Sequence, residues 1–138
     1  MKTPNTILRK RIFEKLQGIS LFGRDVPVFD LLASPEALKP YIIIASSNVI
    51  PDDINKSTVS YQCVVSIDIN TESYGAADVD MITNEATQAL DTINYDLGAS
   101  FQLIRVGIDS INTLPTDLFE TSQVARNVLI MRYTINEH

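Results

Sequence analysis

The sequence predicts an α+β fold, with an antiparallel or mixed sheet of four to five strands and two main helices packed on one of its faces. Three observations predict it. Residues 58–70 alternate between apolar and polar side chains, as a strand with one buried face does. Two other stretches repeat their apolar residues at helical spacing. The remaining alternating stretches come in consecutive pairs, which favours antiparallel neighbours.

Residues 1–138 are expected to form a single domain with a core of its own. A composition of 45% hydrophobic and 20% charged residues is typical of a folded soluble protein. No apolar run approaches the roughly 18 residues of a membrane span, and charges interrupt the N-terminus where a signal peptide is apolar. We therefore expect a chain that is made and kept in a cytoplasm.

The first helix is expected over residues 4–17. Thr3 followed by Pro4 is typical of an N-cap with proline at the first helical position, and Gly18 provides the stop. Its apolar face consists of Leu8, Ile12, Leu16 and Ile19. The charged residues of this helix are expected to point largely outward.

Short elements follow the first helix. Residues 22–25 are expected to turn, and residues 26–29 to extend along a sheet edge, because Pro27 has no N–H to donate. Residues 34–38 indicate one capped helical turn. Residues 41–45 form a strand with apolar side chains on both faces.

Residues 46–56 are predicted to be a long polar loop joining two strands of a hairpin. The strand 58–70 comes next. Val64 is the one apolar residue on its polar side, and Cys63 lies on its apolar side as a small buried hydrophobe.

The second helix follows a turn at residues 71–76. Its apolar face is formed by Val79, Ile82, Ala86, Ala89, Leu90 and Ile93, with Leu97 continuing the face. Residues 101–110 and 123–136 alternate as two further strands, joined by a second long loop at residues 112–122. In the first of these strands Ile104, Val106 and Ile108 are expected to share a side.

Two helices of this length cover about one face of such a sheet. The other face still carries Val64, Val128, Ile130 and half of the apolar run 41–44. Apolar side chains on an otherwise polar face indicate a partner chain. The sequence therefore favours an oligomer.

The net charge of −6 is unevenly distributed. Residues 1–15 hold five basic side chains against one acidic, whereas the rest of the chain holds six basic against sixteen acidic. An acidic body disfavours sequence-independent nucleic-acid binding. The basic helix residues Arg9, Lys10 and Arg11 form either a solvated face or a patch that meets the acidic surface of a neighbouring subunit.

The residues needed for common catalytic sites are scarce. The only cysteine is Cys63 and the only histidine is His138, which removes cysteine metal clusters and histidine-activated nucleophiles. Carboxylate pairs occur at Asp52–Asp53 and at Asp78 and Asp80, where a divalent cation or an acid/base pair is the alternative to ordinary surface chemistry. We expect no catalytic residue, no cofactor and no metal site, and no enzyme activity.

The order of segments resembles the tail terminator, or tail-completion, proteins of long-tailed bacteriophages. The resemblance rests on an amphipathic helix, the extended residues 26–30 (VPVFD), the segment 39–44 (KPYIII), a long alternating strand, a helix and two closing strands. It covers nearly the whole chain, and its closest local match is Pro40–Tyr41 followed by the aliphatic strand.

The resemblance implies a non-enzymatic ring, usually a hexamer, that caps the tail tube, stops its polymerisation and provides the surface that joins the tail to the head. The implied partners are further copies of the chain, the tail tube protein, a head-completion or connector protein, and genomic DNA that passes through the bore without specific binding. No membrane is involved. The protein would reside in the tail or neck of the virion after assembly in the host cytoplasm. An acidic bore would let the DNA slide.

By analogy the two long loops and the basic helix are candidate contact regions. The candidate interface residues are Arg9, Lys10, Arg11, Ile50, Asp52, Asp53, Val64, Asp117, Phe119, Glu120, Val128 and Ile130. Two alternatives remain open: another neck or tail component, such as a head-completion or tube protein, and a small-molecule-binding α+β domain that uses the aspartate pairs.

Overall fold

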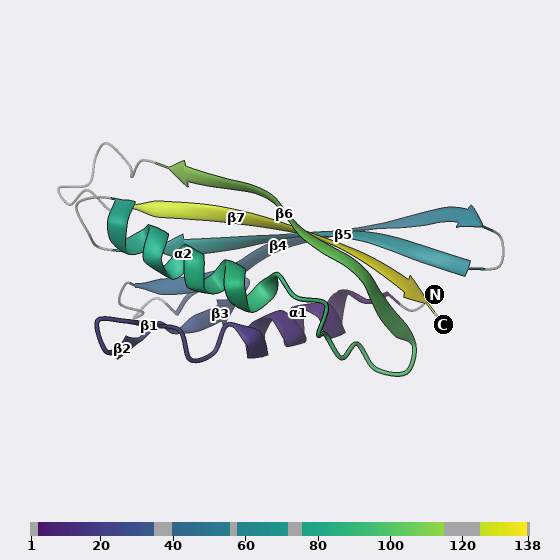
Figure 1. The fold of residues 1–138 in the computed structure, drawn as a ribbon, viewed down its shortest axis with the longest axis horizontal. Helices are drawn as coiled ribbons and strands as arrows, with labels where there is room; N and C mark the ends of the chain where they lie inside the picture. The colour runs from purple at the N-terminus through teal and green to yellow at the C-terminus, as the bar shows by residue number, and fades with distance from the viewer. Residues whose placement is uncertain (1–2, 35–39, 56–57, 72–75, 115–124, 138) are drawn as a thin grey trace.

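The computed structural model describes residues 3–34, 40–55, 58–71, 76–114 and 125–137; residues 52–55, 58 and 76 are described by their backbone alone. Two helices and seven strands occur in these residues (Figure 1). In chain order they are α1 (Asn5–Lys15), β1 (Ser20–Leu21), β2 (Arg24–Asp25), β3 (Val28–Asp30), β4 (Tyr41–Asn55), β5 (Thr58–Asn70), α2 (Ala76–Leu90), β6 (Phe101–Leu114) and β7 (Arg126–Glu137).

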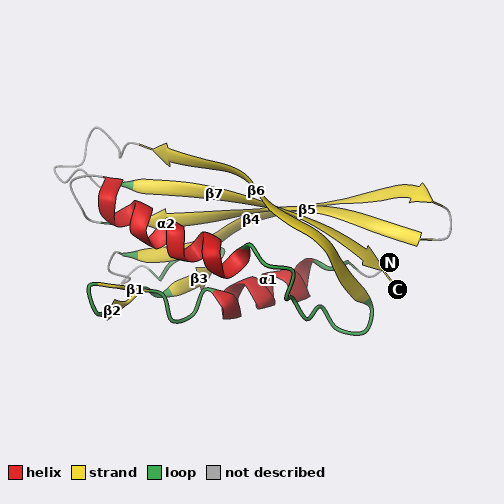
Figure 2. Cartoon of the chain, in the orientation of Figure 1, coloured by secondary structure: helices red, strands yellow, loops and turns green. Residues whose placement is uncertain are grey.

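The main sheet has five strands in the order β3-β4-β5-β7-β6. Strand β3 pairs parallel with β4, and every other pairing in this sheet is antiparallel. Both helices lie on the same side of it, as Figure 2 shows. The predicted α+β class, with a mixed sheet and two helices on one face, is confirmed.

The long strand β5 lies in the centre of the sheet and has the bounds that its alternating pattern predicts. The side chains on its covered face are fully buried: Tyr61, Cys63, Val65, Ile67 and Ile69. It pairs with β7 in an unbroken register from Ser60↔Asn136 to Asn70↔Arg126. The strands that flank this central pair, β4 and β6, each contain two register shifts. They lie at Ile44/Ser47 and Asp52/Asn55 in β4, and at Leu103/Arg105 and Ile108/Ser110 in β6.

The helices close the core over the covered face. Helix α1 lies against β3 and β4 through Leu8 and Ile12, with Leu16 completing its buried side just after the helix. Helix α2 lies against β5 and β7. Its buried apolar residues are Val79, Ile82, Ala86 and Leu90, as the helical spacing predicts.

The predicted loop at residues 46–56 is wrong, because strand β4 continues through this segment to Asn55. The polar side chains of the segment do not prevent strand formation, since pairing with β5 uses the backbone and extends from Ser47↔Val65 to Asn55↔Thr58. The result is a long β4–β5 hairpin that projects beyond both helices (Figure 1).

Other boundaries also differ from the prediction. Helix α1 begins at Asn5 rather than Pro4, and no side chain caps it; the carbonyl of Pro4 accepts the N–H of Leu8 at 2.9 Å. Helix α2 ends at Leu90, so Ile93 leaves the predicted apolar face and is 54% exposed. Strand β6 continues to Leu114. The rest of the second predicted loop, and residues 35–38 of the predicted helical turn, lie outside the described residues.

Candidate functional site

The face of the main sheet that faces away from the helices is the first candidate site. We call it the open face. Register places Val64, Val128 and Ile130 on it, together with Tyr41 and Ile43 from β4, all partly buried. The sequence therefore located these three residues on the uncovered side correctly, because strict alternation in β5 and β7 fixes which side chains share a face.

The open face is more polar than we expected. Arg126 donates from Nε to Asp68 Oδ1 at 2.6 Å and from Nη2 to Asp68 Oδ2 at 2.8 Å. The hydrogen bonds from Arg126 to Asp68 raise the pKa of this guanidinium. Arg132 lies 3.3 Å from Asp109, and Thr134 Oγ1 donates to Gln62 Oε1. Cross-strand pairs, rather than a continuous apolar patch, make up much of this surface.

Exposed apolar side chains gather instead on β6, the edge strand at the far side of the sheet. Four of its aliphatic residues are exposed by more than a third: Ile104, Ile108, Ile111 and Leu114. The sequence did not indicate that these four side chains are exposed along one strand. Val106 and Ile108 lie opposite Tyr133 and Met131 and share the covered side, as predicted. Ile104 falls within the register shift between Leu103 and Arg105 and has no Cα partner in β7.

The basic helix does not present its cations as predicted. Arg9 is 8% exposed and forms an ion pair with Asp30, to which both Nε and Nη2 donate. Nη2 also donates to the carbonyl oxygens of Ile44 at 2.7 Å and Ala45 at 3.2 Å. Because the chain folds back so that β3 and β4 lie beneath α1, Arg9 joins these elements and does not lie on the solvated face.

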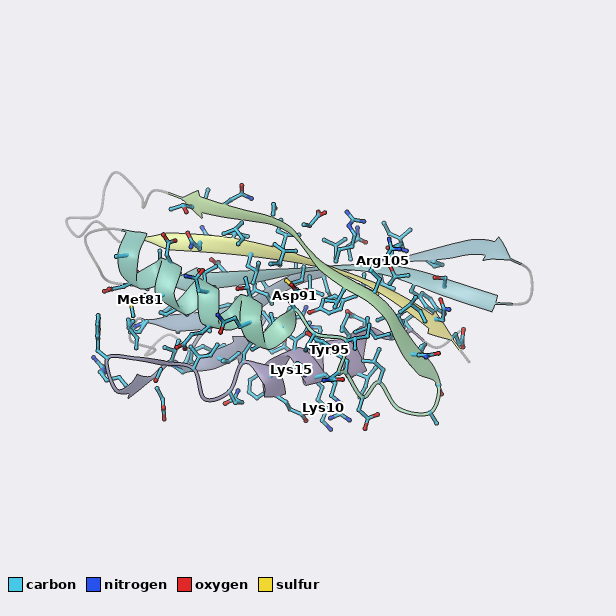
Figure 3. All side chains as sticks on the ribbon, in the orientation of Figure 1. Lys10, Lys15, Met81, Asp91, Tyr95 and Arg105 are labelled. Carbon is cyan, nitrogen blue, oxygen red and sulfur yellow. The ribbon has the colours of Figure 1, made fainter. Side chains whose placement is uncertain are left out.

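Two other cations of α1 also form contacts within the chain. Arg11 donates from Nε to the carbonyl of Asp96 at 2.6 Å and pairs with Glu14 at 2.8 Å. Lys15 places its ammonium 4.7 Å from the ring centre of Tyr95, a cation–π contact (Figure 3). Of the three cations predicted to lie at an interface, Arg9 is buried, Arg11 is partly buried and Lys10 is exposed.

Ile50 lies on the projecting hairpin and is 50% exposed. Asp52 and Asp53 follow it in β4, where the structure describes their backbone. Asp117, Phe119 and Glu120 lie outside the described residues. The contact roles of these residues therefore stay predictions.

The aspartate alternative finds little support in the described geometry. Asp80 is exposed, and its carboxylate accepts a hydrogen bond from Asn127 Nδ2 at 2.9 Å. Asn127 also donates to Thr83, and these two side chains are buried on the covered face. A hollow of about 350 Å³ between α1 and β3 contains neither Asp78 nor Asp80. It is lined by Thr6, Arg9, Lys10, Phe13 and Asp30.

Other ionisable groups on the covered face are enclosed by the core. Burial raises the pKa of the Cys63 thiol to about 11, so it carries little thiolate at neutral pH. Burial also raises the pKa values of Tyr95 and Tyr133, whose hydroxyls lie 2.9 Å apart. Across the described residues, no three histidine, cysteine or acidic side chains are grouped to hold a metal ion, and no helix is long and apolar enough to cross a membrane.

Comparison with known proteins gives one informative result. No family model matches the sequence, and no curated protein matches it. Among solved structures, the fold matches a chain from a structure titled "Virion of native gene transfer agent (GTA) particle", with a TM-score of 0.79. The match covers 99% of this chain and 99% of that one at 13% sequence identity, so it establishes a shared fold over the whole length.

Proposed function

We propose that this protein is a structural component of a virion and, more specifically, a tail terminator that forms a ring on the end of the tail tube. The observation that carries the proposal is the whole-length match to a chain of a gene transfer agent virion. The match extends over 99% of this chain and 99% of the matched chain, so the two share their whole fold. The resemblance of the sequence to tail terminator proteins supports the finer assignment.

The surfaces of the chain fit a role in self-assembly better than a role in catalysis. Four exposed aliphatic residues lie along one edge strand, and both described helices lie on the other side of the sheet from the open face. Exposed apolar surface of this kind marks sites of protein contact. The proposed partners are further copies of this chain in a ring of six, the tail tube protein and a head-completion or connector protein.

The open face also fits a surface past which DNA moves without binding. Two of its arginines, Arg126 and Arg132, each lie within ion-pair distance of an aspartate, which reduces their attraction for phosphate. A bore lined by this face is therefore proposed to be close to neutral, whereas the sequence suggested an acidic lining past which DNA would slide.

The second candidate is another neck or tail component, such as a tube or head-completion protein. The same structural match supports it, because the matched title refers to a whole virion. Tube length separates the two candidates: a terminator limits the tube, whereas a tube protein forms it.

The decisive experiment disrupts the gene for this chain in the genome that carries it. The particles that assemble without the chain are then imaged by negative-stain electron microscopy. A terminator predicts tubes of uncontrolled length that are not joined to heads, with normal particles restored by supplying the intact chain in trans. Tubes that are absent altogether would favour the tube-protein candidate. Particles of normal length and yield would contradict both.

A further inference from the structure

Within the part of the chain that the structure describes, two strand edges of the sheet have no partner over most of their length. Strand β6, which is 14 residues long, pairs there with β7 alone. On the opposite side, β3 covers β4 only from Ile42 to Ile44. Among the described residues, no strand lies along the outer edge of β4 from Ser46 to Asn55. Unpaired edges of this length are templates for adding a strand from another chain.

The directions of the strands allow these two edges to meet in a ring. Strands β4, β5, β7 and β6 are antiparallel in succession, so β6 runs opposite to β4. A rotation about an axis roughly parallel to the strands preserves strand direction, so the β4 strand of the next copy would meet β6 antiparallel. Four strands per copy then repeat up and down without a break, and such a head-to-tail contact forms a ring when the rotation from copy to copy closes.

We propose that the outer edge of β6 pairs antiparallel with residues 46–55 of β4 in a second copy of this chain, so that the sheet continues from subunit to subunit. The inference rests on the ring of the proposed function and identifies the contact that builds it. It assigns the projecting hairpin a function: the part of β4 that extends past β3 is the part that the neighbouring β6 covers.

The composition of β6 favours such a contact. Natural sheets protect their edges with charged side chains, especially lysine, with proline and with bulges. Neither lysine nor proline occurs between Phe101 and Leu114, where the charged residues are Arg105 and Asp109. Its two register shifts bend the strand, but they leave Ile104, Ile108 and Ile111 each more than 40% exposed. A neighbouring strand laid along β6 would bury these side chains.

Charge supports β4 as the occupant. Arg105, on β6, is exposed and lies toward the end of the molecule from which the β4–β5 hairpin projects (Figure 3). Register places it in one cross-strand row with Thr134, Gln62 and Ile50. A copy joined without axial offset therefore brings Arg105 beside the neighbour's Ile50, next to the acidic residues Asp52 and Asp53 in the same strand.

The alternative partner for the β6 edge is the β6 strand of another copy. Antiparallel self-pairing about Gly107 would set Arg105 opposite Asp109 of the other copy and would form a closed dimer rather than a ring. Two observations favour β4 instead: Asp109 already lies near Arg132, and self-pairing would leave the long outer edge of β4 unpaired. The mass of the assembly distinguishes the two arrangements.

The test measures the mass of the full-length protein by native mass spectrometry and sedimentation. We expect the wild-type chain of 15.3 kDa to assemble into six copies. The double substitution Ile104→Lys and Ile108→Lys places two cations on the β6 edge and should weaken assembly by about a hundredfold or more, leaving monomers. The matched control is Ile93→Lys, an exposed isoleucine that belongs to neither strand edge, which should assemble as the wild type does.

Charge reversal identifies the occupant. Arg105→Glu should weaken assembly, and combining it with Asp52→Arg and Asp53→Arg should restore it, because the charges on the two edges are then exchanged. Far-ultraviolet circular dichroism and the melting temperature of each variant show that the monomer fold is kept.

Three results would overturn the proposal: a wild-type chain that stays monomeric at every concentration, a wild-type assembly of two copies, or lysine variants that assemble normally. None of them decides whether the chain limits tube length, which the imaging experiment measures separately.

Discussion

The two faces of the main sheet are made by the same strands and have opposite characters. In β5, Val65 and Ile67 are fully buried beneath the helices, whereas Val64 and Ser66, their sequence neighbours, lie partly buried on the open face. One face carries a continuous apolar core, and the other carries ion pairs and hydrogen bonds between strands. The covered face therefore stabilises the monomer, while the open face and the strand edges remain available for contacts with other chains.

The largest expected effect tests how firmly the helical layer is held to the sheet. Arg9→Met keeps an apolar stem but removes the guanidinium that bonds Asp30 and two backbone carbonyls. We expect a loss of about 3 kcal/mol in the free energy of unfolding, measured by urea denaturation. Lys10→Met, its exposed neighbour, should change stability by less than about 0.5 kcal/mol. Equal effects would show that Arg9 does not hold α1 in place.

The next effect compares the faces directly, with one residue type at two adjacent positions. Val65→Ala removes two methyl groups from the core and should cost about 2 to 3 kcal/mol, because a cavity forms beneath the helices. Val64→Ala, on the open face, should cost under about 1 kcal/mol in the monomer. If the two substitutions were equally destabilising in a monomeric sample, the open face would be part of the monomer core.

A smaller effect is expected in the pH dependence of stability, because Cys63 is buried on the covered face. Burial raises the pKa of its thiol from 9.0 to about 11, so the folded protein keeps this proton longer than the unfolded chain does. The stabilisation is complete below about pH 9 and is lost as the pH rises toward 11. At pH 10 the loss should be on the order of 1 kcal/mol. Cys63→Ala should lower stability at every pH, but with a flatter decline between pH 8 and 10.

The smallest effect concerns the ion pair on the open face. Arg126 and Asp68 form a two-point contact on a partly solvated surface, so their coupling energy in a double-mutant cycle should be about 1 kcal/mol or less. Salt at 1 M should reduce it, because exposed charges are screened. A coupling of several kcal/mol that is insensitive to salt would place this pair in a buried environment.

Much of the sheet could be predicted because period and register are local properties. Strict alternation over 58–70 gives the bounds of β5, and the side of the sheet on which Val64, Val128 and Ile130 lie follows from the same rule. The apolar spacing of α2 also predicts its buried face, although not its end at Leu90. Ile93 continues the spacing but follows the last residue of the helix.

The sequence-based predictions fail where contacts between segments far apart in the sequence determine the structure. The partner of Arg9 is 21 residues away and is brought to it by the return of β3, so a helical wheel gives no sign that this cation is buried. Residues 46–55 look like a loop because they are polar, but their backbone pairs with β5. The exposure of the aliphatic residues of β6 was missed because alternation shows which side chains share a side of a strand, but not how far the helices extend over an edge strand.

The distribution of register shifts has a consequence for how such a gene can change. Between β5 and β7 the pairing is continuous, so inserting or deleting a single codon in either strand would exchange core and surface side chains over everything beyond it. The peripheral strands β4 and β6 already absorb an irregularity at two places each. Length variation among descendants of this sequence should therefore accumulate in those peripheral strands, while the central pair keeps a fixed number of residues.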